Sequence, residues 1–164
     1  MKLLMVCLGN ICRSPLAEGA LRARLTQARL DWVEVDSAGT GGWHAGEPPD
    51  RRSIAIAAEV GVDIRDQRAR KLRAADFERF DWLLCADRSV LRDVRAMAPQ
   101  AATGATGARA EAVLLLEWAG QGAGMEVPDP YTGTQDDFRR VWRMVDTAAE
   151  AIVRRIAAGG DAQR

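Results

Sequence analysis

The fold of this chain is decided by residues 3–15, LLMVCLGNICRSP. An apolar run ends at Cys7, and a segment with helical periodicity follows Arg13. The five residues between Cys7 and Arg13 are enough for a loop to curl around one tetrahedral anion, with backbone N–H groups pointing inward and a helix N-terminus beneath. Gly9 tolerates positive φ, and Asn10 is among the few other residues that do so. The stretch therefore predicts an anion-binding loop between a strand and a helix.

The same loop supplies a candidate nucleophile. The N–H groups and Arg13 are expected to hold Cys7 as the thiolate, and the planar guanidinium suits two phosphate oxygens. Ser14 has two candidate roles, capping the helix that Pro15 begins and donating a hydrogen bond to the sulfur. A cysteine at a strand end is commonly just buried, so it is the joint pattern of strand, Cys-x5-Arg-Ser, proline and helix that favours catalysis. The expected phosphate-binding residues are Leu8, Gly9, Asn10, Ile11, Cys12 and Ser14.

Composition restricts the class of protein. The 164 residues indicate one domain, expected to span residues 1–158 with a flexible tail at 159–164. The 23 basic and 23 acidic residues cancel, which argues against nucleic acid and membranes as partners. The apolar residues before Cys7 are too few for a signal peptide or a membrane span, so a cytoplasmic location is expected. With three cysteines and one histidine, neither a metal site nor a secreted disulfide framework is expected.

Alternating strand and helix patterns predict an α/β fold. Short apolar runs are expected as strands at residues 3–7, 32–36, 82–86 and 112–116. Their mostly unbroken apolarity indicates a sheet that is covered on both faces. Helical patterns are found at residues 15–28, 51–60, 74–79, 89–97 and from Thr134 onward. The alternation favours a parallel sheet, in which ligands bind beyond the carboxyl ends of the strands, and Cys7 lies at such an end.

Two acidic residues near the last helix are interpreted as structural. Thr134 and Asp137 have the spacing of a capping box, and an apolar 3.6-residue period follows through residues 138–152. Asp136 and Asp137 are therefore expected to serve the first helical turn rather than catalysis. Residues 101–110, rich in alanine and glycine, are expected to form a flexible loop.

Residues 6–15, VCLGNICRSP, resemble the signature loop of the low-molecular-weight protein tyrosine phosphatases. The resemblance covers nearly the whole chain, through DSAGT at 36–40, GEPPD at 46–50, AR at 69–70, FDWLLCAD at 80–87, LRD at 91–93 and VPDPY at 127–131. It implies a three-layer, Rossmann-like or flavodoxin-like fold with a four-stranded parallel sheet in the order 2-1-3-4. It also implies hydrolysis of protein phosphotyrosine through a phosphocysteine, without metal or cofactor.

Asp129 is the candidate general acid. Cleavage of a phosphate ester requires a proton for the departing oxygen, which a positioned carboxylic acid provides. Pro128 and Pro130 restrict the backbone on both sides and present the carboxyl group from a loop. The local sequence fits an ordinary Asp-Pro turn equally well. The resemblance implies the catalytic role, because the family's acid lies in the matching Asp-Pro-Tyr segment.

Two aromatic residues are expected at the rim of the substrate site. Trp43 lies in a glycine-rich stretch where a large aromatic is hard to bury, and with Tyr131 opposite it would wall a slot for a phenyl ring above Cys7. The alternative for Trp43 is a loop side chain packed on the surface. His44, a lone loop histidine, is not expected to contact substrate. The remaining tryptophans fall in strand or helix patterns and are expected in the core: Trp32, Trp82, Trp118 and Trp142.

Further positions are interpreted only by the resemblance. The family holds the loop asparagine with a serine after the second strand, and these look like Asn10 and Ser37. Asp66 stands where the family has a histidine in this network, which leaves the bracing of the loop open. Thr132 stands where many relatives have a second aromatic residue, which leaves the width of the slot open.

The resemblance also implies partners and a redox property. Tyrosine-phosphorylated proteins are the implied substrates, phosphate is the product, and a bacterial-type tyrosine kinase is a candidate partner. A monomer or a weak dimer is expected. The family's equivalents of Cys7 and Cys12 can form a reversible disulfide that protects the nucleophile, and we carry this over as a hypothesis.

Four other functions fit the residues of this chain less well. An arsenate reductase of the same fold needs additional cysteines to relay a disulfide, and Cys85 lies in a phosphatase-like context. A protein-arginine phosphatase tends to carry threonine where this chain has Ile11. A phosphocarrier module has little need for Arg13 together with Asp129, and it would not turn over repeatedly. A Cys-His hydrolase would have only His44 available.

Overall fold

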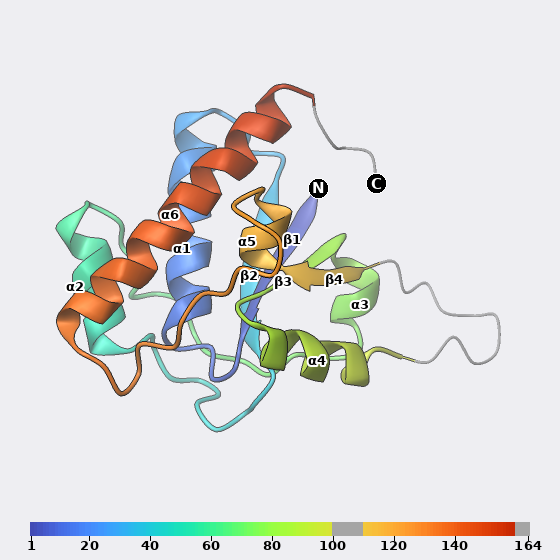
Figure 1. Ribbon diagram of the computed structural model, residues 1–164, viewed down its shortest axis with the longest axis horizontal. Coiled ribbons are helices and arrows are strands. Elements are labelled where there is room, and N and C mark those ends of the chain that lie inside the picture. The colour runs from blue at the N-terminus through green and yellow to red at the C-terminus, as the bar shows by residue number, and fades with distance from the viewer. Residues whose placement is uncertain (100–109, 160–164) are drawn as a thin grey trace.

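A four-stranded parallel sheet forms the centre of the molecule (Figure 1). The computed structural model describes residues 1–99 and 110–159. The sheet has the order β2-β1-β3-β4 and consists of β1 (Lys2–Cys7), β2 (Glu34–Gly39), β3 (Trp82–Cys85) and β4 (Glu111–Leu114). The predicted α/β class, parallel pairing and strand order are confirmed. The expected loop at 101–110 and tail at 159–164 lie outside the described residues, apart from Ala110 and Gly159.

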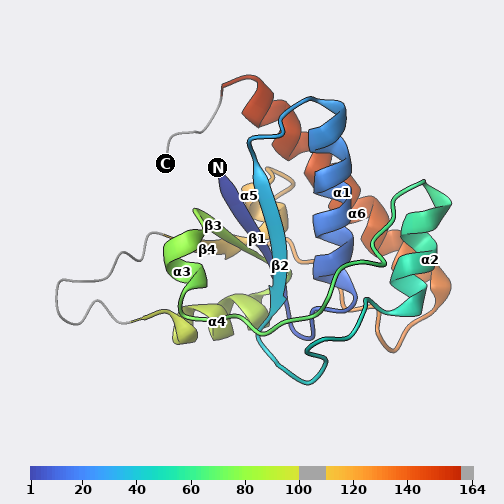
Figure 2. The same ribbon diagram turned by 180° about the vertical axis from the view of Figure 1, so that it is seen from behind.

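Helices cover both faces of the sheet (Figures 1 and 2). One face is covered by α1 (Arg13–Gln27), α5 (Leu115–Trp118) and α6 (Gln135–Ala157), and the other by α3 (Asp76–Arg79) and α4 (Arg88–Met97). The helix α2 (Arg51–Glu59) packs against α1 and α6 rather than on the sheet. Side chains of β1 alternate between the two cores. Leu3, Met5 and Cys7 belong to the core under α1 and α6, whereas Leu4 and Val6 belong to the core under α3 and α4. Both faces of this strand are buried, which explains its unbroken apolarity.

Two strands differ from their predicted bounds by two residues or more, and the other two differ by one. The second strand is Glu34–Gly39 rather than residues 32–36, so Trp32 lies outside the sheet with 56% of its surface exposed, and its predicted place in the core is wrong. The fourth apolar run leaves the sheet after Leu114, and the next two leucines begin α5. An apolar run alone does not distinguish a strand from a buried helix. The other three tryptophans are buried or half-buried, as predicted: Trp82, Trp118 and Trp142.

The helix termini show which capping predictions hold. α1 starts at Arg13, ahead of Pro15, so Ser14 lies inside the helix and its predicted helix-capping role is wrong. α6 begins with the predicted capping box, in which the Thr134 hydroxyl accepts from the Asp137 N–H and the Thr134 N–H donates to Asp137 Oδ2 at 2.8 Å. The helices α2, α3 and α4 agree with prediction within two residues at each end, whereas α5 was not predicted as a helix.

Candidate active site

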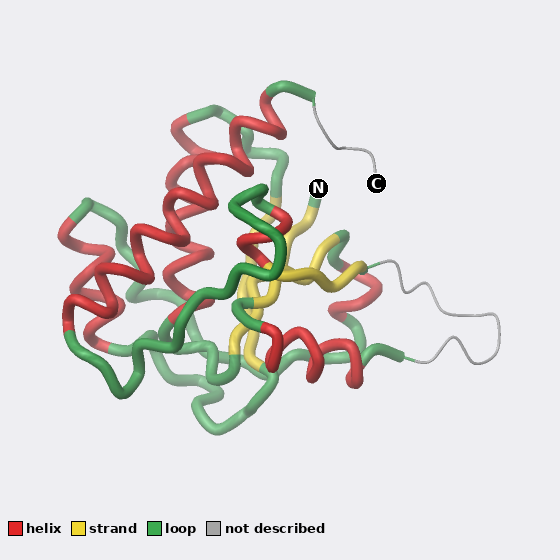
Figure 3. The backbone as a smooth tube through the Cα atoms, viewed as in Figure 1, coloured by secondary structure: helices red, strands yellow, loops and turns green. Residues whose placement is uncertain are grey.

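Residues 8–12 form the loop between β1 and α1, at the carboxyl edge of the sheet where connecting loops gather (Figure 3). β1 is flanked by β2 and β3, so the loop lies at the switch in strand order. Asn10 has φ +57, the left-handed conformation that the sequence predicts at this position. The strand, loop and helix therefore follow one another as expected.

The carbonyls of this loop are bonded to neighbouring segments. The Cys7 and Leu8 carbonyls accept hydrogen bonds of 3.0 and 2.9 Å from the N–H groups of residues 40 and 41. The Ile11 carbonyl accepts from the Asp50 N–H at 2.8 Å. In a planar trans peptide the N–H points away from the carbonyl, so the amide that follows each of these carbonyls points the opposite way. The loop thus turns its carbonyls outward and N–H groups inward, as an anion cradle requires.

Cys7 is buried at the base of the loop. Its Sγ lies 3.0 Å from Ser14 Oγ and accepts a hydrogen bond of 3.3 Å from the Asn10 N–H. Of the two roles considered for Ser14, the geometry supports the contact with the sulfur. Two polar groups therefore converge on the candidate nucleophile from within the loop and the first turn of α1.

Asn10 is braced from three sides. Its Nδ2 donates to Ser14 Oγ at 2.8 Å and to Ser37 Oγ at 3.0 Å, which is the pairing with Ser37 that the resemblance implied. Its Oδ1 accepts from the backbone N–H of Arg70 at 3.0 Å. Asp66 is exposed and has no hydrogen bond to the loop within residues 1–99 and 110–159. A backbone amide therefore completes the brace, and Asp66 takes no part in it.

Arg13 is held by a partner that sequence reasoning missed. The guanidinium is 4% exposed, and its Nη1 donates to Asp87 Oδ2 at 2.6 Å and to the Val127 carbonyl at 3.0 Å. Asp87 also caps α4, because its Oδ1 accepts from the Val90 N–H at 2.8 Å. The signal that could have found it is a carboxylate just after a strand, at the carboxyl edge of the sheet. Asp87 fixes the orientation of Arg13 while leaving Nη2 available.

The charged surroundings act differently on Arg13 and Cys12. Burial lowers the pKa of Arg13, but the negative charges of Cys7, Asp87 and Asp129 more than offset it, so this pKa lies above its ordinary value. Burial, followed by the charge of Asp50, raises the pKa of Cys12 to about 12. Cys12 is therefore a neutral thiol near pH 7. Both Cys7 and Cys12 are free thiols in this structure.

Asp129 reaches the same site from the loop between α5 and α6. Its Oδ2 lies 3.9 Å from Arg13 Nη2, and its Oδ1 accepts from the Tyr131 N–H at 3.1 Å. The loop is anchored to the sheet by a hydrogen bond of 2.8 Å from the Val127 N–H to the Ala86 carbonyl. The side chain is half exposed, so it faces both the guanidinium and solvent.

These residues line one pocket of 200 Å³. Trp43 and Tyr131 line it with exposed side chains and so lie at its rim, where Trp43 is 70% exposed. His44, for which no substrate contact is expected, also lines the pocket, and its Nδ1 is 2.6 Å from Glu47 Oε2. Thr132 is exposed and is not part of the lining among the residues described. The complete lining is Cys7, Leu8, Gly9, Ile11, Cys12, Arg13, Trp43, His44, Asp129 and Tyr131.

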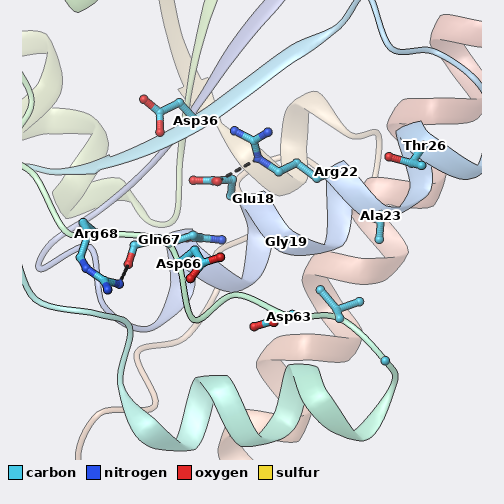
Figure 4. Close-up of a pocket in the computed structure, with 12 residues that line it drawn as sticks. Glu18, Gly19, Arg22, Ala23, Thr26, Asp36, Asp63, Asp66, Gln67 and Arg68 are labelled. Atoms are coloured by element: carbon cyan, nitrogen blue, oxygen red, sulfur yellow. Dashed lines mark hydrogen bonds and ion pairs between the residues drawn. The ribbon is translucent and has the colours of Figure 1, made fainter.

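A larger cavity of 610 Å³ lies beside β2, between α1 and residues 61–68 (Figure 4). Its buried Glu18 pairs with Arg22, with 2.9 Å between Oε2 and Nε, and burial raises the pKa of Glu18. Asp66 also lines this cavity. This larger cavity shares no lining residue with the pocket above Cys7, and no cysteine lines it. The candidate active site is therefore the pocket above Cys7, which the loop of residues 8–12 lines, although the cavity beside β2 is larger.

Two features are absent from the described part of the chain. Within residues 1–99 and 110–159, no group of three or more histidine, cysteine and acidic side chains is placed to hold a metal ion. Over the same ranges, no helix has both the length and the apolarity needed to cross a bilayer.

Comparison with known proteins identifies the family. The model of the family described as low molecular weight phosphotyrosine protein phosphatase matches residues 2–161. A curated low molecular weight protein-tyrosine-phosphatase of Streptomyces coelicolor is 41% identical over 149 residues, which cover 90% of this chain and 88% of the relative.

Solved structures agree with this result. A protein tyrosine phosphatase from Entamoeba histolytica, with Hepes in its active site, has a TM-score of 0.84 and 30% identity and covers 97% of this chain and 98% of its own. A Drosophila arginine phosphatase has a TM-score of 0.85 and 28% identity and covers 95% of this chain and 98% of its own. Since the family match extends from residue 2 to residue 161 and the Streptomyces relative is similar over most of its length, this chain belongs to the low molecular weight phosphotyrosine protein phosphatase family.

Proposed function

We propose that this protein tyrosine phosphatase acts through a phosphocysteine intermediate, with Cys7 as nucleophile and Asp129 as general acid and base. The observation that carries the proposal is that Cys7, Arg13 and Asp129 line one pocket, although Asp129 belongs to a loop far along the chain. The proposed substrates are tyrosine-phosphorylated proteins.

In the first step, the Cys7 thiolate attacks phosphorus in line, and the bond between phosphorus and the tyrosyl oxygen breaks. The inward N–H groups of the loop and the Arg13 guanidinium stabilise the charge on the equatorial oxygens. Asp129 donates its proton to the departing tyrosyl oxygen. The products of this step are free tyrosine on the substrate protein and a phosphocysteine at Cys7.

In the second step, water attacks the phosphocysteine. Asp129, now a carboxylate, takes a proton from this water, and the bond between sulfur and phosphorus breaks to release inorganic phosphate. The Ser14 hydroxyl, 3.0 Å from Sγ, donates a hydrogen bond to the sulfur as it regains its negative charge. Asp129 ends the cycle protonated and Cys7 ends it as a thiolate, so the enzyme is restored.

The apolar wall of the pocket supports an aryl substrate. Ile11 lines the pocket below the aromatic rim formed by Trp43 and Tyr131, and such a slot suits a phenyl ring. Phosphoarginine is the second candidate, because a structural neighbour at a TM-score of 0.85 is an arginine phosphatase. Ile11 offers no polar group to a guanidinium, and this favours phosphotyrosine.

A panel of phosphopeptides tests the reaction class. We expect multiple turnover on phosphotyrosine peptides, a lower kcat/KM on phosphoarginine peptides and no turnover of phosphoserine, whose short side chain does not reach the buried Cys7. Each proton in the proposed cycle is carried by a residue of the chain or by water, so a chelator is expected to leave the initial rate unchanged. A higher kcat/KM on phosphoarginine would overturn the substrate assignment, and a single turnover would indicate a phosphocarrier.

The bracing of Asn10 gives a second prediction. Ser37→Ala removes one hydrogen bond to Asn10 Nδ2 while leaving those to Ser14 and Arg70. One such bond contributes about 0.5–1.5 kcal/mol net, so kcat/KM for p-nitrophenyl phosphate is expected to fall roughly two- to ten-fold. Ser89→Ala, at an exposed serine of α4, is the matched control and should leave the rate unchanged. Equal rates in both variants would show that Ser37 does not position the loop.

A further inference from the structure

A second hollow adjoins the phosphate pocket and has no role in the proposed reaction. It has a volume of 500 Å³ and lies between the loop after β2 and the helix α4, and we call it the α4 hollow. Leu8 and Trp43 line both cavities, so they form the partition between them. The α4 hollow is otherwise walled by Lys71 on one side and by Asp93 and Met97 of α4 on the other.

One side of the partition depends on a glycine, Gly41. A Cβ atom at Gly41 would lie 1.9 Å from the six-membered ring of Trp43, so this ring packs directly on the bare backbone of residue 41. Only glycine permits this contact. The ring of Trp43 thus lies against the backbone of residue 41 although most of its surface is exposed, and Leu8, also exposed, continues the partition from the phosphate loop.

Lys71 places an ammonium group at the α4 hollow. Its backbone is fixed, because the N–H of Gly39 donates to the Arg70 carbonyl at 2.9 Å and the N–H of Leu72 donates to the Gly39 carbonyl at 2.8 Å. The aliphatic stem of Lys71 runs beside Gly42, with Cδ 3.5 Å from where a Cβ would be. Lys71 is exposed and forms no ion pair with another residue in 1–99 or 110–159.

Arg70, which precedes Lys71 in the chain, differs from it in having acidic partners. Arg70 donates to both carboxylate oxygens of Asp76 and to Asp36, so its charge is satisfied within the fold. The charge of Lys71 has no such partner among the described residues, and Lys71 lines a cavity that adjoins the phosphate pocket across Leu8 and Trp43. Asp93 lies on the opposite wall of the α4 hollow, and its negative charge repels the carboxylate of an incoming ligand. Such a carboxylate is therefore directed toward Lys71.

We propose that the α4 hollow binds an acidic side chain next to the phosphotyrosine of the substrate, with its carboxylate on Lys71 and its stem against Leu8 and Trp43. This inference rests on the proposed function. A peptide in the slot advances about 3.3–3.6 Å per residue, so a residue one or two positions from phosphotyrosine can cross the partition. Because the ion pair is exposed, the preference for an acidic over a neutral flanking residue is expected to be about two- to five-fold in kcat/KM.

The test compares phosphotyrosine peptides that carry Glu, Gln or Lys at each of the two positions on either side. The unmodified enzyme should prefer Glu over Gln at one position at least, and rising salt should reduce this preference. Lys71→Met, which keeps the length of the side chain, should abolish it, and Lys71→Glu should reverse it in favour of Lys. Asp93→Asn is the matched control on the opposite wall and should retain or increase the preference for Glu.

p-Nitrophenyl phosphate, which has no flanking residues, separates this inference from the proposed function. Its kcat/KM should be the same in the unmodified enzyme and in both Lys71 variants. If peptides with Glu and Gln are hydrolysed equally, or if Lys71→Met retains the preference, this inference is overturned while the proposed function stands. If neither p-nitrophenyl phosphate nor any phosphotyrosine peptide is hydrolysed, the proposed function fails and the inference fails with it.

Discussion

Cys7→Ser is expected to abolish turnover of p-nitrophenyl phosphate, with kcat reduced on the order of 10⁶-fold, as is typical when a nucleophile is removed. A serine hydroxyl is not ionised near pH 7, and neither the Asn10 N–H nor Ser14 Oγ can act as a base to activate it. The loop amides and Arg13 remain, so phenylphosphonate should still bind. Steady-state kinetics and calorimetric titration measure the two effects separately.

A buried cysteine outside the pocket provides the control for this variant. Cys85 lies in β3, and burial raises its pKa to about 12, so it is a neutral thiol within the core. Cys85→Ala should lower stability through a small cavity and leave kcat for the folded enzyme unchanged. Substantial activity in Cys7→Ser would rule out the phosphocysteine mechanism.

Asp129→Asn is expected to reduce kcat on phosphotyrosine about 10²- to 10⁴-fold, the usual contribution of general acid–base catalysis. The amide keeps an oxygen that can accept from the Tyr131 N–H but has no acidic proton to give to the leaving group. p-Nitrophenolate leaves without protonation, so its release should slow much less than that of tyrosine. Burst kinetics on both substrates measure this difference in the first step.

The control for Asp129 is an acid outside the pocket. Asp136 is exposed in the first turn of α6 and pairs with Arg139 at 2.9 Å. Asp136→Asn should change kcat by less than two-fold, since this exposed pair contributes little to stability and neither residue lines the pocket. Equal losses on both substrates in Asp129→Asn would show that Asp129 acts on binding rather than on the leaving group.

The phosphate loop was predictable because its determinants are local. The strand, the left-handed Asn10 and the presence of a helix after the loop all follow from residues close together in the sequence, and so does the capping box of α6. Strand order was less accessible, since pairing between distant segments leaves no short-range signal, and it came from the resemblance. The resemblance to a family thus supplied the order of the strands, which the periodicity of the sequence alone did not.

The errors arose where tertiary contacts decide. Asp87 is 74 positions from Arg13, and on local grounds it is adequately explained as the cap of α4. Trp32 has the composition of a strand residue, but pairing of β2 with β1 begins only at Glu34, opposite Lys2. His44 lines the pocket because its loop folds back over Gly9, which no pattern within the loop indicates.

The two oxygens of Asp87 serve different elements, since Oδ1 holds the first turn of α4 and Oδ2 holds Arg13. Fraying of that turn and release of the guanidinium are therefore linked through one side chain. The hydrogen bond that orients the guanidinium and the one that closes the first turn of a helix on the other face of the sheet therefore depend on one carboxylate, and loss of Asp87 would remove both at once.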